Sequence, residues 1–273
     1  GTTSGIGYHT AREYASHGAD LLCINRNKEK SITLCKEIEK EFGVSCSWFP
    51  ADYTKISDVI EAGKMLAALD RDIDVLIHNA GVFIKKKTIT ADGYEQVYQV
   101  NFLSSFILTY MLKDKLISQQ HARIIYVNSE GHRFALSGLH LEDPLWKKHL
   151  YTGLKSYGEA KTAQLLSLIP FSSLFKDSSV TIIAMHPGDV KTNMGENNGW
   201  FYRLNKHLMI NSSAKSPKLS AVALYYLGVS ENLKNITGKF FNFTEEEIPA
   251  PHALDTEAAW LLWNTILQSG VIP

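Results

Sequence analysis

Short apolar segments rich in β-branched and aromatic residues alternate along this chain with amphipathic stretches of helical periodicity. The pattern predicts strands at 20–25, 45–50, 74–79, 123–129, 180–186 and 238–243. It predicts helices near 8–17, 28–42, 55–70, 92–119, 156–175, 215–229 and 255–268. Continuous apolar strands alternating with helices are typical of a mostly parallel sheet with helices on both faces, which is an α/β, doubly wound (Rossmann) fold. In such folds, ligands bind at the carboxyl ends of the strands.

The chain begins with a glycine-rich turn, GTTSGIG at residues 1–7, and a helical pattern follows directly. Small residues in such a turn let backbone N–H groups approach a pyrophosphate at the helix N-terminus, although glycine clusters also occur in ordinary turns. A phosphate-binding turn normally follows a buried strand. We therefore expect the first strand of the sheet to lie upstream of Gly1 and to be missing from this chain. Residues 1–273 would then form one domain that is truncated at its N-terminus.

Composition argues against several other functions. Lys and Arg together number 28, as do Asp and Glu, which gives no electrostatic reason to expect a nucleic-acid partner. Cys23, Cys35 and Cys46 are odd in number and form no CxxC pair, so we expect reduced thiols and a cytoplasmic protein. No ligand spacing among the ten histidines predicts a metal site. A segment upstream of Gly1 that anchors a cytosol-facing protein to a membrane is an open alternative.

Five motifs place polar residues on the predicted elements in one order. They are HNAG at 78–81, VNFLSSF around Asn101, VNS ending at Ser129, YGEAK at 157–161 and PGDVKT at 187–192. Each motif alone could be a turn, a helix cap or a pair on a helix surface. Because most of them follow predicted strands, we expect them to meet at one edge of the sheet.

With these motifs in this order, the chain resembles the classical short-chain dehydrogenase/reductase family over essentially its whole length. Asn101, Ser129, Tyr157 and Lys161 match the family's catalytic tetrad, and His78 replaces the first Asn of its NNAG motif. The glycine turn matches TGxxxGxG without the leading Thr. Within the family, the chain is most similar to retinol dehydrogenases and to the oxidoreductase domain of the WW-domain-containing oxidoreductase. It contains no WW module.

The tetrad suits hydride transfer between an alcohol and a carbonyl. Reduction leaves negative charge on the substrate oxygen, so the site needs a proton donor and a polarising contact. Tyr157 can donate that proton if the ammonium group of Lys161 lowers the pKa of the phenol. Ser129 would orient the substrate oxygen, and Lys161 would also hold the nicotinamide ribose. The resemblance implies that Asn101 keeps a water in line with Lys161.

The end of the second strand in the family fold, CINRNKEK, predicts the cofactor. An acidic residue there selects NAD, whereas Arg26 would accommodate the 2′-phosphate of NADP(H), with Ser4 adding a hydroxyl contact. Asp52 either contacts the adenine or caps a helix. The resemblance implies cofactor contacts from Gly1, Ser4, Gly5, Ile6, Gly7, Arg26, Asp52, Tyr53, Asn79, Ala80, Gly81, Tyr157, Lys161, Pro187, Gly188, Val190 and Thr192.

Two functions remain open at this point. The first is an NADP(H)-dependent oxidoreductase for a lipophilic alcohol or carbonyl, such as a retinoid, a steroid or a lipid aldehyde. The second is an inactive, truncated nucleotide-binding or interaction module. The apolar segment 193–217 would be a lid over a hydrophobic substrate or a surface helix with its own small core. His132 and His140 are assigned no role, and the oligomeric state is not predicted.

Overall fold

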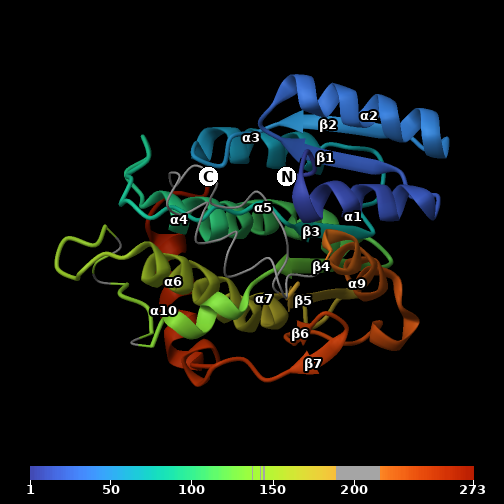
Figure 1. Ribbon diagram of the computed structural model, residues 1–273. Helices are drawn as coiled ribbons and strands as arrows, with labels where there is room; N and C mark the ends of the chain where they lie inside the picture. Colours follow the sequence, from blue (N-terminus) through green and yellow to red (C-terminus); the bar gives the residue numbers. More distant parts are fainter. Residues whose placement is uncertain (137, 142, 144, 189–215) are drawn as a thin grey trace.

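The computed structural model describes residues 1–136, 138–141, 143, 145–188 and 216–273, in which strands and helices alternate as the sequence predicts (Figure 1). The strands are β1 (Leu21–Asn25), β2 (Cys46–Pro50), β3 (Val75–His78), β4 (Ala122–Val127), β5 (Val180–His186), β6 (Phe240–Asn242) and β7 (Glu245–Glu247). The helices are α1 (Gly5–Ser16), α2 (Lys28–Phe42), α3 (Ile56–Ala67), α4 (Gln96–Tyr98), α5 (Ser104–Ser118), α6 (Gly153–Leu166), α7 (Leu168–Leu174), α9 (Pro217–Val229) and α10 (Thr256–Gln268).

Helices cover both faces of the sheet, which confirms the predicted fold class. Helices α1 and α9 pack against each other over one face, and α9 also packs on β4. On the other face, α3 packs against α5, while α6 and α7 pack against α10. The largest core lies on this second face, where α5 contributes fully buried side chains such as Phe106 and Leu112. Burying these apolar side chains is the main driving force for the packing.

Three elements differ from the sequence prediction. The helix expected at 92–119 begins only at Gln96 and contains a π-helical turn at Gln99–Leu103 before α5. The helix expected at 156–175 divides into α6 and α7, because Pro170 has no N–H with which to continue the helical ladder. The last strand folds back through an antiparallel partner, β7. The three glutamates of β7 show no apolar alternation, so its sequence carries no strand signal.

A slot separates two parts of the sheet. Strands β1 and β2 pair in parallel as one sheet, and β3-β4-β5-β6-β7 form a second sheet in that order. A cavity of about 480 Å³ is lined by residues of β1 and of β3, including Leu22, Ile24, Leu76 and Ile77. We therefore expect the two strand edges to accept an additional strand. The expected first strand concerns residues before Gly1, outside this chain, so it stays a prediction.

Candidate active site

The glycine-rich turn lies between the carboxyl ends of β1 and β3. The Gly1 amino group donates to Ile24 O at 2.7 Å, and the Asn79 side-chain amide donates to Gly1 O at 2.7 Å. A Cβ atom at Gly7 would collide with Gly1 O and with the Asn79 amide, and Gly5 has a φ of 58°. The turn therefore requires glycine at both positions. It leads into the N-terminus of α1, where Ser4 makes no side-chain capping bond.

Arg26 follows directly after β1. Its side chain is 72% exposed, and its guanidinium lies 3.9 Å from Asp52 Oδ1. Asp52 Oδ1 also accepts from the Thr54 backbone N–H at 3.0 Å and from its hydroxyl at 2.9 Å, so this carboxylate is part of the turn before α3. Because the Arg26 side chain is exposed and Asp52 is bonded to Thr54, the Arg26 guanidinium is accessible to an anion at the end of β1.

Ser129 and Tyr157 flank the same glycine. A Cβ atom at Gly131 would lie 2.6 Å from the Tyr157 ring and 3.2 Å from Ser129 Oγ. Ser129 Oγ accepts from Gly131 N–H at 3.0 Å, which fixes the hydroxyl just beyond β4. The Phe83 ring packs edge-on against Tyr157 at 5.7 Å. The structure therefore brings the two predicted catalytic groups to one point.

Lys161 lies one helical turn after Tyr157 and is buried. Its ammonium donates to Val127 O at 2.8 Å and to Gln164 Oε1 at 3.4 Å, and it lies 5.9 Å from the Tyr157 ring centroid. Burial lowers the pKa of Lys161 to about 7, because an apolar environment disfavours the charged form. The ammonium charge that the tetrad requires is thus held near its titration point at neutral pH.

Gln164 connects Lys161 to Asn101. Its Oε1 accepts from Asn128 at 2.9 Å, and its Nε2 donates to Asn101 O at 3.2 Å. The Asn101 side chain is paired with the Val82 backbone, accepting at 2.7 Å and donating at 2.9 Å. Asn101 thus reaches Lys161 through Gln164, and its predicted role in holding a water stays a prediction. The sequence analysis did not single out Gln164, although it lies on the same helix as Tyr157 and Lys161.

His78, which replaces the first Asn of the NNAG motif, is a core residue. Its Nε2 lies 2.8 Å from the Thr109 hydroxyl, which in turn lies 3.2 Å from the Tyr126 hydroxyl. Burial lowers the pKa of His78 to about 3, so the ring is neutral at physiological pH. The histidine that departs from the family motif therefore places a neutral, hydrogen-bonded ring between β3 and α5.

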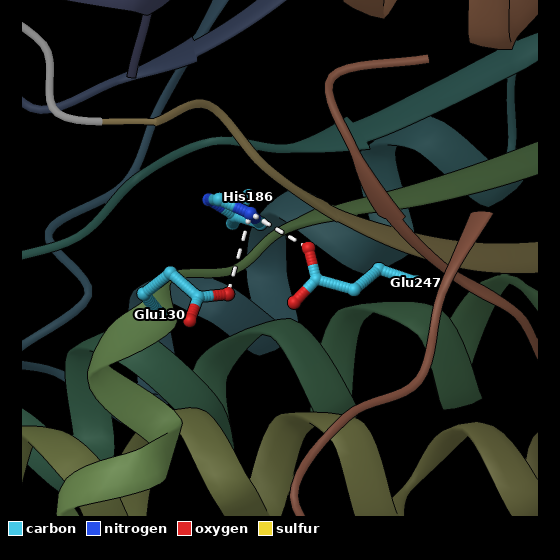
Figure 2. Close-up of side chains that lie close together, drawn as sticks. All are labelled: Glu130, His186 and Glu247. Carbon is cyan, nitrogen blue, oxygen red and sulfur yellow. Dashed lines mark ion pairs between the residues drawn. The ribbon is translucent and has the colours of Figure 1, made fainter. Parts of the chain in front are cut away.

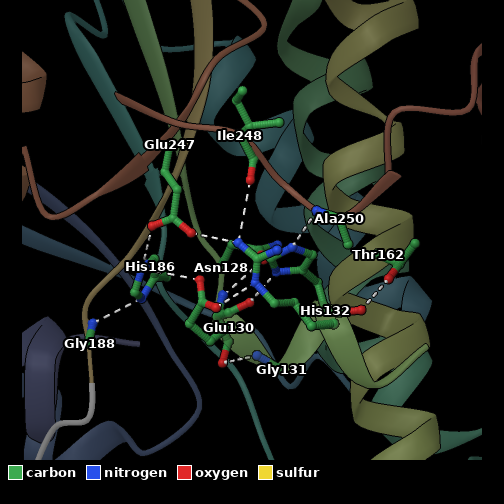
Figure 3. A network of polar contacts seen from close by, with 12 residues as sticks. Asn128, Glu130, Gly131, His132, Thr162, His186, Gly188, Glu247, Ile248 and Ala250 are labelled. Atoms are coloured by element: carbon green, nitrogen blue, oxygen red, sulfur yellow. Dashed lines mark hydrogen bonds and ion pairs between the residues drawn. The ribbon is translucent and has the colours of Figure 1, made fainter. Parts of the chain in front are cut away.

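His132, to which the sequence analysis gave no role, faces Ala250 of the C-terminal segment in Figure 3 and also contacts Ser129. The Ala250 N–H donates to His132 Nε2 at 3.1 Å, so the ring proton is on Nδ1 and is donated to Ser129 O at 2.8 Å. The Thr162 hydroxyl donates to His132 O at 3.1 Å. Burial lowers the pKa of His132, which favours this neutral form. A loop histidine gives no sequence signal for such a role, because its partner lies 118 residues away.

His186 connects the other strand end to the same C-terminal segment. Figure 2 shows its Nε2 facing two carboxylates, 3.3 Å from Glu130 Oε1 and 3.4 Å from Glu247 Oε2. Arg133 pairs with both carboxylates, at 2.6 Å and 2.5 Å. The Gly188 N–H donates to His186 Nδ1 at 3.2 Å. His186 thus links Glu130, which follows Ser129, to the turn at Gly188.

Glu130, His186 and Glu247 also have the composition of a metal site, since their ligand atoms lie within 4.8 Å of one another. A histidine that binds a metal usually donates its second ring N–H to an acceptor. Here the second nitrogen, Nδ1, accepts from the Gly188 N–H instead of donating. Glu130 Oε1 and His186 Nε2 are buried and form no hydrogen bond within the described part of the chain. The cluster therefore lacks the donor pattern of a metal-bound histidine. The sequence-based expectation of no metal site stays a prediction.

Comparison with known proteins identifies the family. A family model described as short chain dehydrogenase matches residues 1–139. Retinol dehydrogenase 13 from Mus musculus is 31% identical over 269 residues, covering 97% of this chain and 80% of that protein. The chain belongs to the short-chain dehydrogenase family. The family resemblance predicted from the motifs is confirmed, and the chain is an oxidoreductase of this family.

Two further proteins show how far the likeness extends. The WW domain-containing oxidoreductase from Drosophila melanogaster is 31% identical over 279 residues, covering 98% of this chain and 67% of that protein. A blue fluorescent protein from a metagenomic library, solved in complex with NADPH, matches with a TM-score of 0.70 at 21% identity. That match covers 89% of this chain and 92% of the solved chain, and it shows that the two chains share a fold.

Some expectations fall on residues that the structure does not describe. Val190, Thr192 and most of the predicted lid segment, with Trp200, Phe201, Tyr202, Leu208, Met209 and Ile210, lie outside the described residues. Pro187 is described, and its carbonyl accepts from the Ser220 hydroxyl at 3.2 Å. Among the helices in the described part of the chain, none has the length and apolarity to cross a bilayer.

The low pKa of Lys161 predicts a pH dependence of stability. The folded-state pKa of about 7 lies below the ordinary value of 10.5, so between these values the unfolded chain holds a proton that the folded chain has released. The free energy of unfolding should therefore rise with pH between these values, by up to about 1.4 kcal/mol per pH unit. Below about pH 7, Lys161 is charged in both states, so the full cost of burying its charge lowers the stability of the fold. Lys161→Met should lose this contribution. Urea unfolding of both proteins at pH values from about 7.5 to 9.5 measures it, and parallel stability curves would contradict the assignment.

Proposed function

We propose that this short-chain dehydrogenase interconverts a lipophilic alcohol and the corresponding carbonyl with NADP(H), using Tyr157 as general acid and base. The observation that carries the proposal is the convergence of Ser129 and Tyr157 on Gly131, with the buried Lys161 ammonium 5.9 Å from the Tyr157 ring centroid. A pure binding module needs no such arrangement of a hydroxyl, a phenol and an amine. The catalytic reading is therefore preferred to the non-catalytic one.

The residues of the glycine turn fit a dinucleotide. The turn has no room for a Cβ at Gly7, and Ser4 leaves the N–H groups at the start of α1 without a side-chain cap. A pyrophosphate would bind at these N–H groups, since a helix N-terminus favours negative charge. The bound nicotinamide would supply the hydride. The fold match to a protein solved with NADPH is consistent with this cofactor class.

Within the site, the chain's own residues would manage the proton and the substrate oxygen. The Ser129 hydroxyl is held by the Gly131 N–H and can donate its proton to a substrate oxygen. Tyr157 would transfer a proton to that oxygen in reduction and would accept one in alcohol oxidation. The charged form of Lys161 would stabilise the phenolate. Gln164 holds the Lys161 ammonium and the Asn101 carbonyl in place.

Apolar groups around Tyr157 support a lipophilic substrate. Phe83 packs against the ring, Phe134 is 49% exposed at the end of the 3-10 helix Glu130–Phe134, and Leu154 is 45% exposed on α6. The name of one relative, retinol dehydrogenase 13, points to the same substrate class. With NADPH, we expect retinal, steroid ketones and fatty aldehydes to be reduced faster than small polar ketones and sugars. A screen in which the polar compounds are better substrates would contradict the proposal.

Arg26 should set the preference for NADP(H) over NAD(H). Its guanidinium is exposed at the end of β1, where we expect the adenosine ribose to bind, and the strand end carries no Asp or Glu. A hydrogen bond to a charged group is worth about 1.5–3 kcal/mol, so Arg26→Ala should reduce the preference by about tenfold to a hundredfold. Fluorescence titration with NADPH and NADH measures both affinities. Lys28→Ala, which removes an exposed cation nearby, is the control. Equal or tighter NADH binding by the unmodified chain would show that Arg26 does not bind the phosphate.

A further inference from the structure

Two segments that are far apart in sequence form one exposed surface beside the start of α6. Residues 84–89 read IKKKTI, and residues 146–155 read WKKHLYTGLK. The Lys87 ammonium donates to Trp146 O at 2.9 Å, and the Tyr151 hydroxyl donates to Ile84 O at 3.4 Å. In Figure 1 both segments project from the same end of the molecule. We call this surface the lysine–leucine patch, formed by Lys85, Lys86, Lys147, Lys148, Leu150, Leu154 and Lys155.

The charge of the patch has one sign. Neither segment contains an aspartate or a glutamate, although the whole chain carries equal numbers of acidic and basic residues. The carboxylate of Asp143 lies close by but is buried, where it accepts from the backbone N–H groups of Lys147 and Lys148 at 2.6 and 2.7 Å. The lysine side chains at 86, 147, 148 and 155 are exposed. A surface of this kind attracts anions through its positive local potential, which salt screens.

Large apolar side chains stand among these lysines. Leu150 is 78% exposed and Leu154 is 45% exposed. Gly158 lies one helical turn after Leu154, and a Cβ there would lie 3.0 Å from Ala135 N, so the neighbouring Leu136, which is 85% exposed, borders the same face of α6. Exposed leucines interspersed with lysines are typical of surfaces that insert into the headgroup region of a membrane. Nucleic-acid binding would not require the leucines to be exposed.

The patch also borders the candidate active site. Leu154 precedes Tyr157 by three residues on α6, and Phe83, which contacts the Tyr157 ring, directly precedes the first segment. We propose that the lysine–leucine patch docks on the surface of an anionic lipid bilayer, with Leu150 and Leu154 entering the headgroup region. The entrance to Tyr157 then faces the membrane, from which a lipophilic substrate can enter. This last consequence rests on the proposed function, whereas the docking itself does not.

Vesicle flotation of the unmodified chain, without cofactor or substrate, tests the docking. We expect at least tenfold stronger binding to phosphatidylcholine vesicles containing about 30% phosphatidylserine than to phosphatidylcholine alone, and a loss of this binding at high salt. Each lysine near an anionic surface contributes about fivefold in affinity, so Lys147→Glu with Lys148→Glu should weaken binding at least 25-fold. Leu150→Ser, which leaves the charge unchanged, should weaken it about tenfold.

The matched control is Lys36→Glu with Lys40→Glu, the same charge change on the exposed side of α2. It should alter vesicle binding less than twofold if the patch, rather than net charge, binds the lipid. Circular dichroism and melting curves establish that each variant is folded. Equal binding to neutral and anionic vesicles, equal effects of the two lysine pairs, or binding to duplex DNA without binding to vesicles would overturn the proposal. Vesicle binding is measured without turnover, so the docking proposal can hold even if the chain proves inactive. A separate assay that found no activity would refute only the proposed function.

Discussion

Placing six apolar, β-branched residues directly before Gly1 is expected to raise the melting temperature of the chain by about 10 °C or more. The added strand would occupy the slot of about 480 Å³ between β1 and β3 and would pair with both facing edges. It would bury apolar surface on both faces and join two sheets that are separate in the present structure. It would also hold the glycine turn from its N-terminal side.

The control is the same extension with a proline and two lysines in its centre. The proline lacks a backbone N–H for pairing with the neighbouring strand, and the lysine side chains cannot be buried. This version should leave the melting temperature within a few degrees of the unextended chain. Scanning calorimetry of the three proteins measures the difference. If the apolar and the proline-containing extensions behave alike, the slot does not bind a strand.

Tyr157→Phe is expected to lower carbonyl reduction at least about 100-fold while changing NADPH affinity less than about threefold. The substitution keeps the ring that packs against Phe83 and over Gly131, and it removes the group that can transfer a proton. Steady-state turnover and cofactor titration, in the chain with and without the added strand, measure the two effects separately. Tyr226→Phe, at a tyrosine of α9 that is 39% exposed, should change neither.

Equal turnover of the Tyr157 variant and the unmodified chain would remove the phenol from the mechanism. It would favour the alternative in which the fold binds a nucleotide without catalysis. Loss of both turnover and cofactor binding would instead indicate that Tyr157 supports the site structurally, because general acid catalysis predicts a loss of turnover alone.

The sequence by itself determined most of the strands and helices of the fold and the order of the candidate site residues along the chain. Period-2 and period-3.6 patterns are local properties, so the strand ends could be located within a few residues, and Ser129 and Asn79 could be placed beyond them. The glycine-rich turn before α1 was visible as a motif, whereas the reason that Gly5 and Gly7 must be glycine came from the structure. The spacing of Tyr157 and Lys161 by one helical turn was equally visible.

Only the tertiary structure decided which side chains hold these groups in place. Gln164 meets Asn101 across 63 residues, and His132 meets Ala250 across 118 residues. His186 faces Glu247 through an antiparallel strand whose three glutamates give no strand signal. The lysine–leucine patch likewise exists only because residues 84–89 pack against 146–155. Such contacts depend on how the chain closes long loops around a common core, and the local patterns from which elements are predicted contain no information about those partners.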